Sequence, residues 1–333
     1  MKILVLSTGG TIGSEAHDGI ISPDSKTTVK LLSLYRSQNI HDDTEFICEK
    51  AADTLSENIT DDFYETLINF FLNFSNNGFG GVIVLHGTDT LDYTAALVSM
   101  ACRNFSLPVG FVSANLPLQD PNSNGVSNFG AAVQYIKAGG NGFFVPYRNH
   151  DGEIKIHLAT RLFSADSVYD DFNSISDLIL ADYNNEEIKF SDNALMPSQN
   201  ELANPQSAVY NDKIELNKKI ILIKTYPGID YSLFDLKDKN IAAVLNLAYH
   251  SGTAPAYLSD FAERCRALGI DNYICPVKNT ESLYASAAEI LKIGVRPLPQ
   301  MTVASAIANL KIFYHSDNLN HKILNQSLYF EII

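Results

Sequence analysis

Short apolar runs alternate with amphipathic stretches along most of the chain. In the first part, each run is bounded by polar or glycine-containing turns, which is typical of strands buried in a parallel sheet. The stretches between them have helical periodicity, so the pattern predicts βαβ units and an α/β domain built on a parallel sheet with flanking helices. The predicted strands are Ile3–Leu6, Val82–Leu85, Pro108–Val112 and Gly142–Val145, and the predicted helices are Thr27–Arg36, Asp61–Phe74, Asp92–Arg103 and Asn128–Ala138.

A polar stretch over 184–218 lacks this periodicity, and a second alternation follows it. The change in composition places a boundary between about residues 195 and 215. We therefore expect an N-terminal domain over 1–195, a linker over 196–217 and a smaller C-terminal α/β domain over 218–333. The strands predicted there are Ile220–Ile223, Ala242–Leu247 and Asn272–Cys275, and the helices are Pro255–Leu268, Leu283–Ile293 and Thr302–Phe313.

Composition narrows the classes of function. The chain has 333 residues, 46% hydrophobic and 19% charged, with a net charge of −14 and no cluster of Lys and Arg, which argues against a nucleic-acid partner. It begins directly with a predicted strand and has no apolar run of bilayer length, so we expect a cytoplasmic protein without a membrane partner. The cysteines lack CxxC spacing and the histidines lack metal-ligand spacing, so we expect reduced thiols and no metal.

Two of the predicted strands run into turns that carry threonine. Ser7–Gly13 follows the first strand, and His86–Leu91 follows the second. The carboxyl ends of parallel strands are where such sheets bind ligands. A threonine hydroxyl needs a nearby base to act as a nucleophile, and glycine backbone can approach a ligand and offer N–H groups to an oxyanion. Thr11, Thr88 and Asp89 are therefore candidates for nucleophilic chemistry on a small polar substrate.

Each motif alone also has a simpler interpretation. The glycine pair before Thr11 could form an ordinary turn or a phosphate-binding loop, although it lacks the spacing of a nucleotide-binding loop. His86, beside an apolar run, is more simply explained as a hydrogen-bonded structural histidine than as a base. The two motifs in this order, each at a strand end, are more specific than either one.

Together these motifs resemble the two signatures of the bacterial L-asparaginase family, and the chain is closer to the cytoplasmic type I form than to the periplasmic form. The family's fold, an α/β sheet domain that carries the site and a smaller α/β domain, agrees with the pattern above. The further segments that carry the resemblance are Ser56–Ile59, Ser113–Pro117, Ser123–Gly125, Asn128, Thr225–Gly228, Tyr249–Pro255 and Gln300–Thr302.

The resemblance implies a role for each matching residue. Thr11 would attack the side-chain amide carbon, and Thr88 with Asp89 would activate water or the hydroxyl. Asp89 would also contact the substrate's α-amino group. The implied substrate-binding residues are Gly10, Gly87, Ser56 for the α-carboxylate, Glu57 beside the α-amino group, and Ala114 through its backbone carbonyl.

The activity so implied is hydrolysis of L-asparagine to L-aspartate and ammonia through an acyl-enzyme, without a cofactor, in a homodimer or homotetramer. Two alternatives remain open. One is a catalytically weakened homologue that binds aspartate, asparagine or a related small ligand. The other is an amidase for glutamine or a larger substrate, as in the glutamine-dependent tRNA amidotransferase subunit of the same superfamily.

Two departures from the family pattern bear on activity. The family carries a lysine that completes a Thr-Asp-Lys relay, and its position falls on Arg161 or on Phe163, depending on the alignment. Arginine stays protonated, so Arg161 could hold Asp89 but not exchange a proton with it; Lys155 is a nearby substitute that the sequence does not place. The family's loop tyrosine is also missing, since no tyrosine precedes Tyr35. Residues replaced at lesser positions are Asn124, for an aspartate, and Thr253, for an asparagine.

Overall fold

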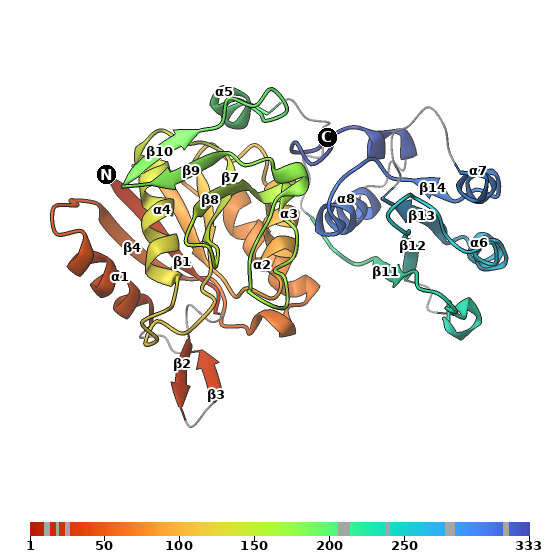
Figure 1. Cartoon of the computed structure of the whole chain (residues 1–333), viewed down its shortest axis with the longest axis horizontal. Coiled ribbons are helices and arrows are strands. Elements are labelled where there is room, and N and C mark those ends of the chain that lie inside the picture. Colours follow the sequence, from red (N-terminus) through yellow and green to blue (C-terminus); the bar gives the residue numbers. More distant parts are fainter. Residues whose placement is uncertain are drawn as a thin grey trace. The chain divides into compact units, whose positions relative to one another are not determined.

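The structure is a computed structural model that describes residues 1–9, 14–17, 20–23, 27–205, 214–237, 240–276, 284–315 and 320–333; for 14–17, 20–23 and 27 only the backbone is described. The chain divides into two compact units, Met1–Gln206 and Ser207–Ile333. Figure 1 shows a sheet flanked by helices in each of them.

The first unit is built on an eight-stranded sheet whose order is β10-β9-β8-β7-β6-β5-β1-β4. The strands from β4 to β7 are parallel, so their carboxyl ends meet at one edge, whereas β7 to β10 pair antiparallel. A separate two-stranded hairpin joins β2 to β3. The bounds are β1 Lys2–Ser7, β2 Ser14–His17, β3 Ile20–Pro23, β4 Glu45–Lys50, β5 Gly81–Leu85, β6 Val109–Val112, β7 Phe143–Arg148, β8 Ile154–Leu158, β9 Ala181–Asn184 and β10 Glu187–Phe190.

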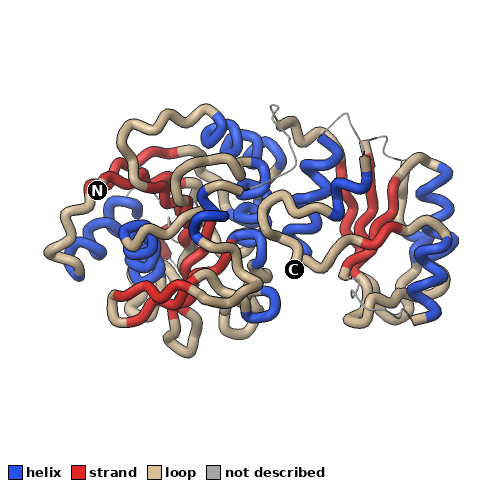
Figure 2. Tube along the Cα trace, turned by 90° about the horizontal axis from the view of Figure 1, so that it is seen from above, coloured by secondary structure: helices blue, strands red, loops and turns tan. Residues whose placement is uncertain are grey.

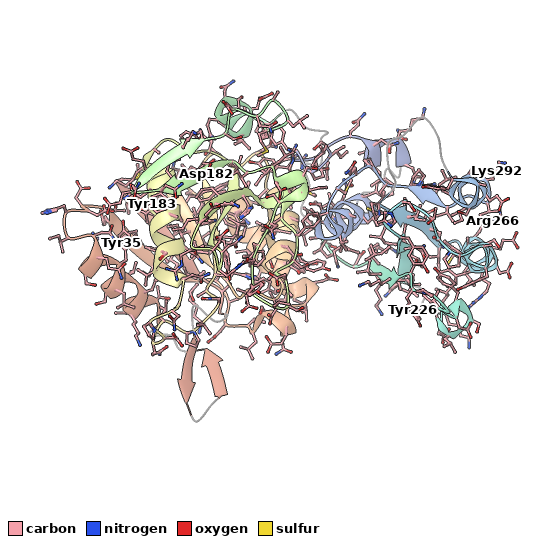
Figure 3. The ribbon with its side chains drawn as sticks, in the orientation of Figure 1. Tyr35, Asp182, Tyr183, Tyr226, Arg266 and Lys292 are labelled. Atoms are coloured by element: carbon pink, nitrogen blue, oxygen red, sulfur yellow. The ribbon has the colours of Figure 1, made fainter. Side chains whose placement is uncertain are left out.

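Four helices cover this sheet, with α1 against α4 and α2 against α3 (Figure 1). Tyr35 of α1, labelled in Figure 3, packs edge-on against Phe46 and Phe129, with ring centroids 5.6 and 5.3 Å away. These aromatic contacts join α1, β4 and α4 into one core. Edge-to-face ring pairs add favourable electrostatic energy to the energy gained by burying the rings. The bounds are α1 Thr27–Gln38, α2 Asp61–Leu72, α3 Leu91–Ala101 and α4 Gly125–Lys137.

The second unit contains a parallel four-stranded sheet in the order β11-β12-β13-β14 (Figure 2). Alternate residues of its strands supply two cores: Val244 and Ile274 face one cluster with Phe261 of α6, and Leu245 and Tyr273 face another with α8. Both faces are therefore covered, as a parallel sheet requires. The bounds are β11 Lys219–Lys224, β12 Ile241–Leu247, β13 Asp271–Cys275, β14 Arg296–Pro297, α6 Leu258–Ala267, α7 Ala285–Lys292 and α8 Val303–His315.

The predicted fold class is confirmed: a parallel sheet with flanking helices, followed by a smaller α/β unit. The sequence pattern did not predict the antiparallel flank from β8 to β10. Its last hairpin turns on Asn185 and Glu186, both with positive φ (49° and 64°), as in the two-residue turns that suit twisted strands. The hairpin therefore lies within the predicted N-terminal domain and overlaps the start of the polar stretch over 184–218.

A short helix, α5 (Gln199–Ala203), lies within the stretch that we expected to be linker. Ser198 caps it in a reciprocal capping box with Glu201. The Gln199 side chain accepts a hydrogen bond from the Asn141 backbone at 2.7 Å. This contact attaches α5 to the first unit, which extends to Gln206.

Candidate active site

The two threonine-bearing motifs lie side by side because β1 and β5 are neighbouring parallel strands. The Thr8 backbone N–H and its hydroxyl both donate to the Leu85 carbonyl, at 3.2 and 2.7 Å. The turn after β1 therefore starts directly beside the turn that carries Thr88 and Asp89. Parallel sheets bind ligands at the carboxyl ends of their strands, which we call the strand-end rule, and both turns lie at that edge of the sheet.

Gly9 shapes the first of these turns. Its φ is +103°, and a Cβ at this position would lie 2.4 Å from the Thr54 carbonyl oxygen. The Thr54 N–H in turn donates to the Thr8 carbonyl at 3.0 Å. Only glycine fits here, so the backbone conformation and the contact with Thr54 together direct the chain toward Gly10 and Thr11. Those two residues lie outside the described part of the structure, and their predicted roles stay predictions.

Ser56 and Asp89 come together across the site. Ser56 is the buried first residue of a turn of 3-10 helix (Ser56–Asn58), and its hydroxyl donates to Asp89 Oδ2 at 3.3 Å. The Thr90 hydroxyl donates to the Ser56 carbonyl at 3.0 Å, which ties this turn to the start of α3. Thr88 is partly buried and Asp89 exposed, so a hydroxyl and a carboxylate face solvent at a helix N-terminus, where an anion is favoured.

The other predicted binding residues occupy different settings. Gly87 and Ala114 are buried, and Glu57 is exposed. Among the described residues, no hydrogen bond joins Glu57 or Ala114 to Asp89. Thr253 belongs to the second unit, where its carbonyl accepts from the Tyr249 N–H at 2.9 Å in a turn.

His86 is enclosed beneath the site. Its Nδ1 lies 2.8 Å from the Gly87 carbonyl, and its Nε2 has no partner among the described residues. Burial lowers the pKa of His86 to about 4. The imidazole is therefore neutral near pH 7, with Nδ1–H donating to the carbonyl, which favours the structural interpretation of this histidine.

The loop after β6 is held by an asparagine pair. The Asn115 N–H donates to the Asn124 side chain at 2.9 Å, and the Asn124 N–H donates to the Asn115 side chain at 3.0 Å. Asn124 also donates through Nδ2 to the Arg148 carbonyl at 2.9 Å. The amide that replaces the family's aspartate thus links the ends of β6 and β7, next to Ala114.

The two positions expected for the relay lysine, Arg161 and Phe163, lie in different surroundings. Arg161 is buried, and its Nη1 donates to the Leu195 carbonyl at 2.7 Å. The Ser164 hydroxyl instead donates at 2.5 Å to Asp92 Oδ2, in the first turn of α3. Burial raises the pKa of the Asp92 carboxyl. The segment that contains Phe163 therefore adjoins the helix that begins after Asp89.

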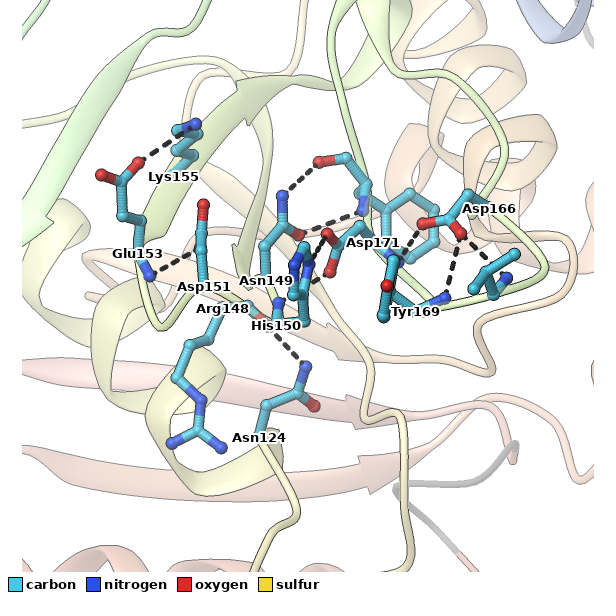
Figure 4. A network of polar contacts seen from close by, with 12 residues as sticks. Asn124, Arg148, Asn149, His150, Asp151, Glu153, Lys155, Asp166, Tyr169 and Asp171 are labelled. Carbon is cyan, nitrogen blue, oxygen red and sulfur yellow. Dashed lines mark hydrogen bonds and ion pairs between the residues drawn. The ribbon is translucent and has the colours of Figure 1, made fainter.

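Lys155, the other basic candidate, is on β8. Its Nζ lies 3.2 Å from Glu153 Oε2, and Figure 4 shows this ion pair. Lys155 is therefore paired with a carboxylate that directly precedes its own strand.

Sequence reasoning missed a polar group at the end of β7. Arg148, Asn149 and His150 line a pocket of about 370 Å³, together with Asn115 and Asn124. The signal for it was present, since these residues follow a predicted strand and the same strand-end rule applies to them.

No metal site or membrane span was found in the part of the chain that the structure describes. That part holds no group of three or more His, Cys, Asp or Glu side chains placed to bind a metal ion. Within the same ranges, no helix is both long and apolar enough to cross a bilayer. All four cysteines are free thiols.

Comparison with known proteins relates this geometry to one family. The family model described as "Asparaginase, N-terminal" matches residues 2–196. A glutamyl-tRNA(Gln) amidotransferase subunit of Pyrococcus abyssi is 26% identical over 335 aligned residues, covering 96% of this chain and 73% of that protein.

Solved structures share the fold. The thermostable L-asparaginase of Thermococcus kodakarensis aligns with a TM-score of 0.81 at 23% identity, covering 100% of this chain and 99% of that one. A probable cytoplasmic L-asparaginase of Campylobacter jejuni aligns with a TM-score of 0.76 at 19% identity, with the same coverage. Because the family match spans more than half of the chain and includes the strand ends that form the site, this protein belongs to the asparaginase family of amidohydrolases.

Proposed function

We propose that this protein hydrolyses the side-chain amide of a small amino acid, with L-asparagine as the first substrate and Thr11 as the nucleophile. The observation that carries the proposal is the hydrogen bond between Ser56 and Asp89 at the start of α3, beside the turn that leads to Thr11. An amino acid needs both a group for its α-carboxylate and a group for its α-ammonium. A hydroxyl next to an exposed carboxylate supplies the two.

The proposed reaction is a double displacement. The Thr11 hydroxyl oxygen bonds to the amide carbon, and the carbonyl electrons move onto the oxygen to give a tetrahedral oxyanion. Backbone N–H groups of Gly10 and Gly87 stabilise that charge. Asp89, with Thr88, takes the proton that the Thr11 hydroxyl loses and passes it to the amide nitrogen. Collapse of the oxyanion then breaks the C–N bond, and ammonia leaves. Water, oriented by Thr88 and Asp89, then attacks the acyl-threonine ester to release the acid and restore the hydroxyl.

Ammonia release from L-asparagine and L-glutamine tests the proposal. Thr11→Ala should lower turnover by about 10³-fold or more, because the nucleophile acts as a unit with its activating groups. Thr66→Ala is the matched control, since Thr66 is exposed on α2 and bonds only its own helix, at 2.8 Å to the Asp62 carbonyl. Turnover that survives Thr11→Ala would refute the threonine mechanism.

Substrate binding gives a second, independent measurement. Ser56→Ala should weaken calorimetric binding of L-aspartate by about tenfold or more, since it removes a hydrogen bond to a charged group. Intact aspartate binding without ammonia release from either amide would favour the weakened homologue. Arg161 favours this alternative, because its guanidinium is engaged with Leu195.

A second candidate is an amidase that delivers ammonia to a larger acceptor. The likeness to an amidotransferase component over 96% of this chain favours it. In that case glutamine would be the better amide substrate, and turnover would rise on adding a partner protein that binds tRNA.

We further propose a cytoplasmic homodimer or homotetramer that acts without a cofactor. The name of the Campylobacter neighbour supports the location. Light scattering of the purified chain measures the assembly directly, and a monomer would refute that part.

A further inference from the structure

The pocket at the end of β7 has an uneven distribution of charge. Its volume is about 370 Å³, which suits a small organic molecule. Among the described residues that line it are one arginine, one histidine and several asparagines, and none is an aspartate or glutamate. The lining therefore offers hydrogen-bond donors without a negative charge of its own.

Tyr147 contributes a buried polar atom that has no protein partner. The residue is 1% exposed and its ring packs against Phe172, with centroids 4.7 Å apart. Tyr147 is one of the residues that line the pocket, and its buried hydroxyl makes no hydrogen bond within the described chain. The nearby Asn124 amide acts to lower the pKa of this hydroxyl. The Asn124 oxygen accepts from the Asn115 N–H, and its Nδ2 donates to the Arg148 carbonyl.

An unpartnered buried hydroxyl is unfavourable, typically by about 1–3 kcal/mol, so it calls for an explanation. Burial raises the pKa of Tyr147 to about 12, and the group therefore remains a protonated donor.

Arg148 supplies a fixed positive charge. Its guanidinium donates to the Ser127 hydroxyl at 3.2 Å and to the Asn122 and Ser123 carbonyls at 3.1 and 3.3 Å. Within the described residues, Arg148 forms no ion pair with a carboxylate, whereas Lys155 on the next strand pairs with Glu153. The contacts orient the guanidinium over the first turn of α4 while leaving its charge uncompensated.

His150 is held in place by a loop in which the Asp171 carboxylate points toward the His150 ring and the Asp166 carboxylate binds backbone N–H groups of the loop itself (Figure 4). Its Nδ1 pairs with Asp171, and its ring stacks on Tyr169 with centroids 4.2 Å apart and planes at 15°. Asp166 accepts from the backbone N–H groups of Val168, Tyr169 and Asp171. The hydrogen bond that His150 donates to Asp171 raises the pKa of His150, which favours its charged form.

We propose that this pocket binds the oxyanion group of a small organic or inorganic acid, with Arg148, the Tyr147 hydroxyl and His150 as donors. A carboxylate and a phosphate share the chemistry that such a site recognises, namely negative oxygens that accept from a guanidinium and from hydroxyl and imidazole donors. The buried hydroxyl gains the partner that the protein does not provide.

The site is joined to the proposed catalytic edge through the asparagine pair. Asn115 lines the pocket and directly follows Ala114, while Asn124 bonds both Asn115 and the Arg148 carbonyl. A ligand in the pocket would therefore contact the same loop that presents Ala114.

Titration of the full chain with succinate and with inorganic phosphate tests the proposal, with the His150 ring resonance in NMR as the readout. A saturable shift with succinate or phosphate is expected, and the more effective probe identifies the oxyanion. Succinamide is the neutral control, and a shift as large with succinamide would overturn the proposal. So would the absence of a shift with both acids.

Variants separate this pocket from the catalytic centre, where succinate could also bind. Tyr147→Phe should weaken binding by about tenfold or more while leaving the melting temperature unchanged or higher, because it removes an unsatisfied group. Arg148→Met should weaken binding too, whereas Lys155→Met, which removes a charge outside the pocket, should not.

Ser56→Ala tests the proposed catalytic centre and should leave the His150 shift intact. Loss of the shift in Ser56→Ala, or its full retention in Tyr147→Phe, would refute the assignment. Because the readout needs no turnover, it stands even if the amidase proposal fails.

Discussion

A single methyl group at Gly9 would test how the candidate site is built. In Gly9→Ala the new Cβ would lie 2.4 Å from the Thr54 carbonyl oxygen and 2.8 Å from the Thr54 nitrogen. Ordinary contacts begin near 3.4 Å, so the backbone must shift by about 1 Å. The partner atoms belong to the main chain, and no side-chain rotation relieves the overlap.

Two terms contribute to the expected loss of stability. The left-handed conformation costs alanine about 1–2 kcal/mol, and the overlap adds about 1–3 kcal/mol. Gly139→Ala separates them, because Gly139 also has positive φ (+81°) but its Cβ would meet nothing within 4 Å. We therefore expect Gly9→Ala to lower the free energy of unfolding by about 2–5 kcal/mol and Gly139→Ala by about 1–2 kcal/mol.

The same shift should reach the chemistry. A displacement of about 1 Å at a reacting group lowers rates by about 10²-fold. Urea unfolding and ammonia release on both variants are the assays. Equal destabilisation of the two variants, with turnover unchanged in Gly9→Ala, would refute the argument that this close contact positions the turn.

Three further predictions follow from the described contacts. Burial lowers the pKa of His86 from 6.5 to about 4, so as the pH falls through that interval the unfolded chain binds this proton and the folded chain does not. The free energy of unfolding should therefore drop by about 3 kcal/mol between these pH values and then level off. Urea unfolding of His86→Asn across the same pH range should lack this drop. Phe163→Lys should raise amidase turnover and Arg161→Lys should not, because the arginine is engaged elsewhere; the opposite order in ammonia release would support the other alignment. Ser198→Ala should lower stability by about 1 kcal/mol through loss of the cap on α5, and an unchanged melting temperature would contradict this.

Much of the fold could be predicted because buried strands have a recognisable pattern. Ile3–Leu6 and Val82–Leu85 are buried on both faces and form continuous apolar runs. Edge strands lack that pattern. β4 is mostly exposed and carries charge at Glu45, Glu49 and Lys50, so neither a continuous apolar run nor a strict alternation marks it.

The hairpin from β9 to β10 was missed for a related reason. Its turn is formed by Asn185 and Glu186 without the glycine that usually marks such turns. A polar run of this kind is indistinguishable from a linker until pairing partners are known.

The site was predictable in part. The apolar run predicted that Thr88 and Asp89 follow the end of a strand, and they follow β5. The approach of Ser56 to Asp89 joins positions 33 residues apart and was suggested only by the resemblance. The pair of His150 and Asp171 depends on a loop of irregular backbone, which no periodicity describes.

The mixed sheet has a consequence for the order in which the chain folds. The hairpin from β9 to β10 joins residues that are adjacent in sequence, and such pairings close within microseconds. The contact between Thr8 and Leu85 spans 77 residues and must await the intervening segments, including β4 and α2. Long-range parallel pairing is slow because loop-closure entropy is lost before the contacts form. During synthesis, β1 therefore leaves the ribosome well before β5 does, and the backbone N–H and C=O groups on the edge of β1 that pairs with β5 stay without that partner until β5 emerges.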